Sequence, residues 1–440
     1  MSKVTIVGAG LAGCEACWQV CVAGVRADLY EMRPGVMTPA HHSGDFAELV
    51  CSNSLGSGSL KNASGLLKEE LRALGSMVLA AADRHRLPAG GALAVDRWAF
   101  AREITERISI QSLVTVIREE AQRIPSTTGG PVIVATGPLT SPALAEDIAG
   151  FTGEQALYFF DAASPIVSRD SIDPECAFFG SRYGHTGEVL GPEGGDYINC
   201  PLSEDQYSVF YDALLTAEKA VLHSFEPTGF FEGCLPVEEI ARRGRDTLRY
   251  GPMKPVGLTD PRTGKRPYAV VQLRQDDSDG RMYNIVGFQT SLRWSEQDRV
   301  FRLVPALRNA EFLRHGVMHR NTYLDASRVL LPSMQAKKIP DVLFAGQLCG
   351  VEGYVESTAT GWLAGHNAAR IALGREPLVM PVETMMGALA KYICTPRAGP
   401  LQPMNSNWGL LPPVEVRVRG KRQIHENMAA RALEAVRRIL

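Results

Sequence analysis

The first apolar run of the chain is followed at once by glycines, and this order predicts a strand, a turn and a helix. Residues 4–7 (Val-Thr-Ile-Val) are apolar and mostly β-branched, which is typical of a buried parallel strand. Gly-Ala-Gly-Leu-Ala-Gly follows, and a helical stretch is predicted from Cys14 to about Ala23. Residues 24–30 turn back into a second predicted strand, which ends at Glu31. The pattern therefore predicts a strand–helix–strand unit.

Each part of this unit suits a dinucleotide. Gly8 permits a tight turn, Gly10 lets the backbone approach a pyrophosphate, and Gly13 lets helix and strand pack closely. The helix N-terminus offers unpaired N–H groups to the phosphates. Glu31 lies where a carboxylate can bind a ribose hydroxyl. We predict a dinucleotide site here; the competing interpretation is an ordinary αβ unit without a ligand.

The first unit does not decide between FAD and NAD, but two later segments favour FAD. Residues 131–137 form a strand that ends in Ala-Thr-Gly, as is usual for the return strand of two-domain flavoproteins. Residues 342–347 form another strand, before a glycine-rich turn and a helix predicted from about Glu356. Such a turn commonly holds the flavin end of FAD. The candidate FAD-binding residues are Gly8, Ala9, Gly10, Leu11, Ala12, Gly13, Glu31, Arg33, Thr136, Gly137, Gly346, Gln347 and Gly353.

The flavoprotein pattern is interrupted in the middle of the chain. We predict an α/β fold with a Rossmann-type FAD-binding domain of the two-domain, glutathione-reductase-like class, formed by residues 1–150 and 330–440. Residues 151–329 are predicted to be an inserted α+β domain for substrate or tRNA. Within the first part, residues 65–82 read as one long amphipathic helix, with Lys68, Glu69, Glu70 and Arg72 on its water-facing side.

Composition narrows the class of protein. A chain of 440 residues should hold two domains, and its net charge of −2 means that any nucleic-acid site must be a local patch. No apolar run reaches the roughly 20 residues that span a bilayer. The predicted strand at residue 4 leaves no room for a signal peptide. Nine irregularly spaced cysteines favour a reducing compartment, so we predict a cytoplasmic protein.

Two cysteines lie in settings unlike a protein core. Cys51 lies in a loop rich in Ser, Asn and Gly, and Cys234 lies between a glycine and a Leu-Pro pair. Both are candidates for chemistry, because catalytic groups concentrate in such loops. Cys14 and Cys17 form a C-x-x-C pair on a helix face that should pack on the sheet, so we predict them buried. No metal site is predicted, because the adjacent histidines at residues 41–42 lack partners at ligand spacing.

A basic segment lies within the predicted inserted domain. Its candidate tRNA-binding residues are Arg242, Arg243, Arg245, Arg249 and Lys254. With Tyr250 among them, they suit phosphate contacts and base stacking. An equally good interpretation, on charge alone, is a solvated face paired with Asp and Glu.

Several segments together resemble one known family. They include Glu-Leu-Val-Cys-Ser-Asn-Ser-Leu at residues 48–55, Phe-Glu-Gly-Cys at 231–234, Gly-Pro-Met-Lys-Pro-Val-Gly-Leu at 251–258, and residues 88–97, 318–322 and 346–357. The chain resembles the folate- and FAD-dependent tRNA (uracil-5-)-methyltransferases essentially from end to end. It departs from their pattern in a long glycine-rich excursion at residues 184–195 and at Cys349, where a threonine is expected.

The resemblance implies a specific reaction. 5-Methyluridine would form in the T loop of tRNA, with carbon from 5,10-methylenetetrahydrofolate, hydride from reduced FAD, and NAD(P)H to re-reduce the FAD. Uracil C5 becomes nucleophilic only after a group such as a thiolate adds at C6, and a second group must remove the C5 proton. The family pattern assigns these roles to Cys234 as nucleophile and Cys51 as acid/base, although the sequence does not fix which does which. His319 and Tyr354 would line the flavin and folate pocket.

Two other functions compete with this one. The first is the related enzyme that modifies wobble uridine with carboxymethylaminomethyl groups; it carries an extra C-terminal helical domain, whereas this chain ends soon after the predicted flavin domain. The second is a flavin-binding RNA-binding module without turnover, against which the settings of Cys51 and Cys234 argue. The expected partners are the T arm of tRNA, folate and NAD(P)H, with no membrane and no obligate protein partner.

Overall fold

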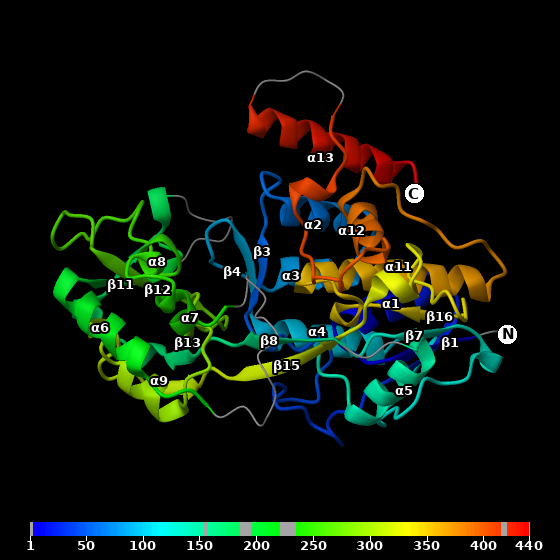
Figure 1. The fold of residues 1–440 in the computed structure, drawn as a ribbon, viewed down its shortest axis with the longest axis horizontal. Helices are drawn as coiled ribbons and strands as arrows, with labels where there is room; N and C mark the ends of the chain where they lie inside the picture. The colour runs from blue at the N-terminus through cyan, green and yellow to red at the C-terminus, as the bar shows by residue number, and fades with distance from the viewer. Residues whose placement is uncertain (1–2, 154–156, 185–194, 221–234, 415–419, 440) are drawn as a thin grey trace.

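The computed structural model describes residues 3–153, 157–184, 195–220, 235–414 and 420–439. Two lobes are visible, one built on a parallel sheet and one on an antiparallel sheet (Figure 1). Each lobe has its own cluster of buried apolar side chains. The predicted α/β class is confirmed. How the lobes are joined determines where the site lies.

The parallel lobe contains the predicted strand–helix–strand unit. Its sheet has the strand order β16-β7-β1-β2-β6, and every neighbouring pair is parallel. The strands are β1 (Lys3–Val7), β2 (Arg26–Tyr30), β6 (Val114–Ile117), β7 (Val132–Val134) and β16 (Val342–Phe344). The sequence predicts four of these strands, β1, β2, β7 and β16, near these positions. Helix α1 (Leu11–Val22) begins directly after the glycine loop, three residues earlier than the pattern predicts.

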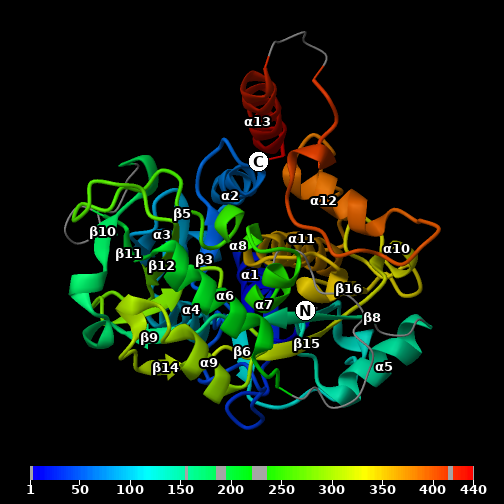
Figure 2. The ribbon, with the colours of Figure 1, turned by 60° about the vertical axis from the view of Figure 1, so that its left-hand side comes forward.

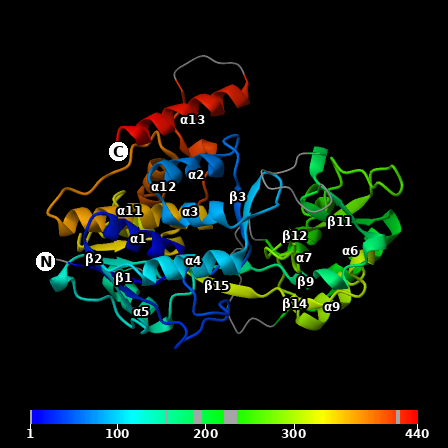
Figure 3. The ribbon, with the colours of Figure 1, turned by 180° about the vertical axis from the view of Figure 1, so that it is seen from behind.

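Helix α11 (Tyr354–Ala372) lies directly against α1 (Figure 3). The close approach depends on two glycines one turn apart. A Cβ atom at Gly361 would lie 2.3 Å from the carbonyl oxygen of Ala12, and one at Gly365 would lie 2.4 Å from that of Ala16. Real Cβ atoms do not approach a carbonyl oxygen so closely, so only glycine fits at these positions. This packing brings the N-terminus of α11 beside the glycine loop.

The antiparallel lobe is built on a six-stranded sheet of order β10-β11-β12-β13-β9-β14. Its strands are β9 (Ile166–Ser168), β10 (Phe178–Gly180), β11 (Tyr197–Leu202), β12 (Ala269–Gln275), β13 (Met282–Ile285) and β14 (Phe312–Arg314). Its helices are α6 (Glu204–Thr216), α7 (Val237–Arg242), α8 (Thr247–Tyr250) and α9 (Trp294–Phe301).

A two-stranded antiparallel ribbon links the lobes, formed by β8 (Leu157–Ala162) and β15 (Met318–Tyr323) (Figure 1). The chain leaves the parallel lobe after α5 (Pro142–Thr152) and returns along β15 before α10 (Ala326–Val329). This path agrees with an insertion, while the predicted boundaries at residues 151 and 329 stay a prediction.

A layer of helices and short strands covers the other side of α1. It contains β3 (Ser54–Ser57), β4 (Arg86–Leu87), β5 (Ala92–Val95), α4 (Arg97–Ser109), α12 (Met385–Cys394) and α13 (Lys421–Arg437). Helix α13 lies outermost and packs along α2 (Ala63–Ala73), as Figure 2 shows. Within the described ranges, no helix is both long and apolar enough to cross a bilayer.

The single helix predicted at residues 65–82 is wrong. The segment forms α2 and then α3 (Met77–Arg84), because Gly75 adopts φ +72° and the Ser76 side chain caps α3 by accepting from Leu79 N. Lys68 and Glu70, predicted to face water, are buried. Lys68 Nζ donates to the carbonyl oxygen of Ser57 at 2.9 Å, and the Glu70 carboxylate accepts from the first amides of α12.

Candidate active site between the lobes

The glycine loop has the geometry that a pyrophosphate site requires. Gly8 adopts φ +97°, and a Cβ there would lie 2.6 Å from the Ala135 carbonyl oxygen. A Cβ at Gly13 would lie 1.8 Å from the carbonyl oxygen of Gly8, so this glycine is needed for packing. At Gly10, by contrast, a Cβ would meet no atom of the chain within 4 Å. The chain therefore leaves space beside Gly10, at the N-terminus of α1, where a ligand can approach.

Glu31 ties the end of β2 to this loop. Its Oε2 accepts from Ala9 N at 3.0 Å, and its Oε1 accepts from Arg33 Nε at 2.9 Å. Arg33 is itself buried and also donates to Glu48 at 3.3 Å. Burial alone would raise the pKa of Glu31, but the hydrogen bonds and charge of Arg33 hold that pKa below its usual value. Glu31 is therefore a fixed anion at the point where a ribose would lie.

A pocket of about 1010 Å³, counted with the open space at its mouth, runs along this edge of the parallel sheet. A volume of this order suits a large cofactor. Eleven of the candidate FAD-binding residues line it: Gly8, Gly10, Leu11, Ala12, Glu31, Arg33, Thr136, Gly137, Gly346, Gln347 and Tyr354. The residues present therefore fit a dinucleotide.

Three further candidates act beside the pocket rather than in its lining. Ala9 binds Glu31, Gly13 permits the packing described above, and Gly353 precedes α11 with φ +118°. The lining also includes residues that the sequence did not single out as ligands: Thr38, His41, Glu48, Val50, Glu119 and Glu120. The two adjacent histidines were the only feature of the sequence that drew attention to this part of the lining. In the structure, His41 Nδ1 lies 2.6 Å from Thr38 Oγ1.

Tyr354 connects this pocket to Cys51. Its hydroxyl oxygen lies 3.0 Å from Cys51 Sγ, and it accepts from the backbone amides of Cys51 at 3.0 Å and of Ser52 at 3.3 Å. Burial raises the pKa of Tyr354 well above its usual range, and the neighbouring Cys51 raises it further. The phenol is therefore protonated. Cys51 is half-buried and lies next to two residues of the pocket lining, Val50 before it in the chain and Tyr354 in space.

Three arginines surround the Cys51 loop, of which Arg97 and Arg274 are buried and Arg314 is partly buried. Arg97, at the start of α4, donates to the carbonyl oxygen of Leu49 at 3.0 Å, and Arg314 of β14 donates to that of Val50. Arg274 of β12 donates to Ser52 Oγ and Asn53 Oδ1, both at 2.9 Å. The loop is thus fixed by residues from both lobes.

Of these three arginines, Arg97 is the one for which the described residues show an ion pair with a carboxylate. Burial would lower the pKa of Arg97, but Asp276, 2.9 Å away, holds that pKa above its usual value. Burial lowers the pKa of Arg274. The pKa of Arg314 is lowered by burial and then by repulsion from Arg97. All three guanidiniums remain cations near neutral pH, since an arginine starts from a pKa above 12.

Two predicted site residues are not placed. Cys234, the predicted nucleophile, lies outside the described residues. His319 lies on β15, opposite Asp161 of β8, but its side chain is also outside the described part. Cys14 and Cys17 are buried on α1, as predicted. In the part of the chain that the structure describes, no cluster of three or more His, Cys, Asp or Glu side chains could hold a metal ion.

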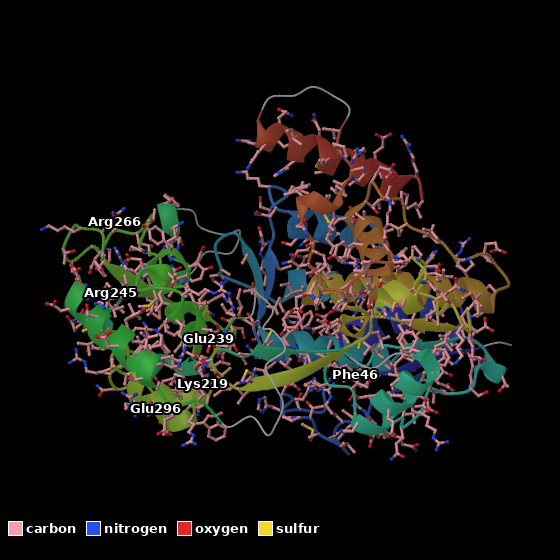
Figure 4. All side chains as sticks on the ribbon, in the orientation of Figure 1. Phe46, Lys219, Glu239, Arg245, Arg266 and Glu296 are labelled. Atoms are coloured by element: carbon pink, nitrogen blue, oxygen red, sulfur yellow. The ribbon has the colours of Figure 1, made fainter. Side chains whose placement is uncertain are left out.

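The basic segment covers one end of the antiparallel lobe. Figure 4 shows Arg245 and Arg266 on this lobe, on the far side of the molecule from Phe46. Arg249 lies over the Tyr268 ring at 3.7 Å and donates to Asp246 at 2.7 Å, while Arg245 lies 3.8 Å from Asp212. Tyr250 is 82% exposed. The segment thus combines exposed cations and an aromatic ring with partial pairing to carboxylates, so both predicted interpretations describe part of it.

Comparison with known proteins adds sequence relationships to this geometry. The family described as "GIDA: Glucose inhibited division protein A" matches residues 3–376. The methylenetetrahydrofolate--tRNA-(uracil-5-)-methyltransferase TrmFO of Heliobacterium modesticaldum is 56% identical over 437 residues, which cover 99% of this chain and 98% of that protein. The protein of the same name from Desulforudis audaxviator is 58% identical over 434 residues, 98% of this chain and 96% of that protein.

The fold also has a solved counterpart. The crystal structure of Aquifex aeolicus GidA (form II) matches with a TM-score of 0.70 and 16% sequence identity, over 100% of this chain and 73% of that chain. At this identity the match concerns the fold alone.

Proposed function

This chain belongs to the Glucose inhibited division protein A family and, within it, to the methylenetetrahydrofolate–tRNA-(uracil-5-)-methyltransferases, and from this membership we propose how its site works. The protein methylates C5 of a tRNA uridine with a carbon from methylenetetrahydrofolate. We propose that the uridine is that of the T loop, that FAD is the bound cofactor and that NAD(P)H reduces it.

The residues that would hold FAD follow from the pocket. The amides at the N-terminus of α1, with the open space beside Gly10, suit the pyrophosphate, and Glu31 suits the adenosine ribose. Gly346, Gln347 and Tyr354 would border the flavin. Reduced FAD supplies the hydride that converts the one-carbon unit to a methyl group.

The two cysteines would carry out the chemistry on uracil. Addition of the Cys234 thiolate to C6 pushes electrons onto the C4 carbonyl oxygen, and C5 of the resulting enolate attacks the one-carbon unit. Cys51 would then take the proton from C5, so that the enolate re-forms with the carbon attached. The re-formed enolate would expel the folate nitrogen, which leaves a methylene group on C5. Addition of hydride to this carbon would form the methyl group and move electrons into the C5–C6 bond, so that the bond between Cys234 and C6 breaks and the thiolate leaves. Cys234 as nucleophile and Cys51 as base are proposed from the family pattern.

One observation carries the proposal for Cys51. Tyr354 lines the cofactor pocket and at the same time binds the Cys51 thiol and its loop. A cysteine bound to a tyrosine of the pocket lining suits the role of the base, because C5 of the uracil would have to approach the folate carbon and the reducing flavin together.

The tRNA would lie against the antiparallel lobe. Exposed Tyr250 and the arginines beside it, Arg243 and Arg245, line an open surface hollow on that lobe. Such a hollow suits a phosphate and a stacked base. Arg242, Arg249 and Lys254 extend the proposed surface.

The competing functions have less support. The methyltransferase relatives are 56–58% identical over nearly the whole chain, whereas the 16% identity to GidA supports only a shared fold. An RNA-binding module without turnover does not need a thiol that contacts a phenol and lies on a loop fixed by three arginines.

The test is an activity assay with a T-loop tRNA transcript, methylenetetrahydrofolate and NADPH. We expect 5-methyluridine from the flavin-containing protein and none from Cys51→Ala, which lacks the base. Ser57→Ala, a change on the neighbouring strand β3, is the matched control and should retain activity. Equal activity in Cys51→Ala would remove Cys51 from the mechanism.

A further inference from the structure

The hydrogen bonds around Tyr354 fix the direction of its own proton. The phenol oxygen accepts from two backbone amides, Cys51 N at 3.0 Å and Ser52 N at 3.3 Å. A phenol oxygen has two lone pairs and one proton. Since amides can only donate, both lone pairs are used, and the hydroxyl proton points to Cys51 Sγ, 3.0 Å away. The sulfur is therefore an acceptor, a role that a thiolate fills much more strongly than a neutral thiol does.

The surrounding charge points the same way. Arg97 and Arg274 are buried, Arg314 is partly buried, and all three interact electrostatically with Cys51. Over the described ranges, Asp276 is the only carboxylate that hydrogen-bonds to any of the three. Arg314 Nε is buried with no hydrogen-bond partner among the described residues. Buried cations in excess of their anions are costly, and an anion placed among them is stabilised.

We infer that Cys51 rests as a thiolate before substrate binds, and that Tyr354, Arg274 and Arg314 are the positioning residues that hold it in this form. Tyr354 donates a proton to the sulfur, while the two arginines supply positive charge and fix the loop from the antiparallel lobe. Arg97 contributes charge that Asp276 partly neutralises.

One further titratable group lies on the same loop. His42 faces Arg314 and Arg97, and burial followed by the charge of Arg314 lowers its pKa, so it adds no positive charge near neutral pH. Among the described residues, the charged and titratable groups around Cys51 are thus Tyr354, Arg97, Arg274, Arg314, Asp276, His42 and Glu48, and Glu48 is itself paired with Arg33. Their net charge is positive.

This inference deepens the proposed function, because a base must begin without its proton. A thiolate at Cys51 can take the C5 proton directly. A thiol there would first have to lose its own proton to another group. The inference is also independent of turnover, so it can be tested without tRNA or folate.

The experiment measures the pH dependence of Cys51 alkylation in the flavin-containing protein. Iodoacetamide is the probe, the modified Cys51 peptide is quantified by mass spectrometry, and N-acetylcysteine in the same solution is the reference. We expect the rate at Cys51 to rise with an inflection below about pH 7.5, at least about one unit below that of the reference, near 8.5. An inflection at or above that of the reference would overturn the inference.

Variants show whether Tyr354 and Arg274 favour the ionised form of Cys51 or only maintain the structure around it. In Tyr354→Phe the ring remains but the proton donor is lost, and in Arg274→Met the charge is lost. Each should move the inflection up by about one unit, so that the alkylation rate near pH 6.5 falls about tenfold. Arg274→Lys keeps the charge and should stay close to the wild type, which also covers the case in which Arg274→Met fails to fold.

Arg182→Met is the matched control. Arg182 is also a partly buried arginine of the antiparallel lobe that donates to backbone carbonyls, including that of Val256 at 3.0 Å, but Cys51 is not among the groups that shift its pKa. Its loss should leave the inflection in place. The inference fails if Tyr354→Phe leaves the inflection of Cys51 unchanged, or if Arg182→Met shifts it as far as Arg274→Met does.

Discussion

Cys51 and Tyr354 are 303 positions apart in the chain, yet they form the contact on which the site depends. The sequence indicated Cys51 because a thiol in a Ser- and Gly-rich loop is unusual for a core residue. It did not indicate that Arg97, Arg274 and Arg314 hold the Cys51 loop, because these three residues lie far from Cys51 in the chain. They meet only when strands of the inserted lobe pack against the first lobe, and no local pattern encodes that contact.

The two cysteines can be distinguished with 5-fluorouridine tRNA. Its C5 carries no removable proton, so the reaction stops after addition at C6 and attack on the one-carbon unit. Cys51→Ala should still form a covalent protein–RNA adduct, whereas Cys234→Ala should form none. Denaturing gel electrophoresis with radiolabelled RNA measures the adduct. An adduct from Cys234→Ala alone would reverse the two roles.

A substitution at Gly10 tests whether the pyrophosphate lies beside this residue. Because a Cβ at this position meets no atom of the chain within 4 Å, Gly10→Val should fold yet lose bound flavin, since the side chain would lie where the pyrophosphate belongs. Flavin absorbance per mole of protein measures the loss, and we expect a clear reduction in bound flavin compared with the wild type.

Gly150→Val provides the matched control for that change. Gly150 lies on α5, away from the lining of the large pocket, and a Cβ there also meets open space. The variant should stay yellow. Full flavin content in Gly10→Val would mean that the pyrophosphate does not lie beside this residue.

Among the elements, the strands and the glycine-loop helix could be predicted well, whereas the segment around α2 could not. A strand between glycines is recognisable from its apolar run, and the loop from its spacing. Residues 65–82 show helical periodicity throughout, so the break at Gly75 and the burial of Glu70 were missed. Glu70 is buried because it accepts from Met385 N at 2.6 Å and Met386 N at 2.9 Å, at the distant N-terminus of α12.

Glu70 makes the stability of this element depend on pH. Burial raises the pKa of Glu70 from 4.5 to about 7, so the folded protein binds the proton more tightly than the unfolded chain. The contribution of Glu70 to the free energy of unfolding is therefore fully present below about pH 4.5. It is lost as pH rises through about 7, by up to roughly 3 kcal/mol.

The measurement is urea unfolding of the wild type and Glu70→Gln at several pH values across this range. The difference between the two free energies of unfolding should change with pH in the stated direction, because glutamine does not titrate. Glu69→Gln alters the neighbouring, more exposed carboxylate and should give no such change. A constant difference between wild type and Glu70→Gln would contradict the assignment.

On the scale of the whole molecule, the two-lobed arrangement places the cofactor pocket on one lobe and the basic segment on the other. The sequence indicated both parts, through the glycine loop and the clustered arginines. It left open whether the arginines are paired with carboxylates. In the structure Arg249 is paired with the nearby Asp246, and Arg245 lies close to Asp212 of α6. The proposed tRNA surface therefore depends on the unpaired fraction of that charge.

Salt dependence measures that surface. Binding of tRNA should weaken steeply with salt, at a log–log slope of about −0.7 to −0.9 per neutralised phosphate. Reversing Arg243 and Arg249 to glutamate should weaken binding and make the slope shallower by about one to two phosphates' worth. Arg26→Glu, an exposed position on β2 of the other lobe, serves as control and should change little. Unchanged binding in the double variant would place the tRNA elsewhere.

The most direct test of the central claim follows the carbon and the electrons together. The flavin-containing protein is incubated with a T-loop tRNA, NADPH and methylenetetrahydrofolate labelled with carbon-13 in the methylene group, and the nucleosides are analysed by mass spectrometry. The account predicts 5-methyluridine that carries the label, formed only when both NADPH and the folate are present. Unlabelled 5-methyluridine, or methylation that proceeds with S-adenosylmethionine in place of the folate, would contradict it.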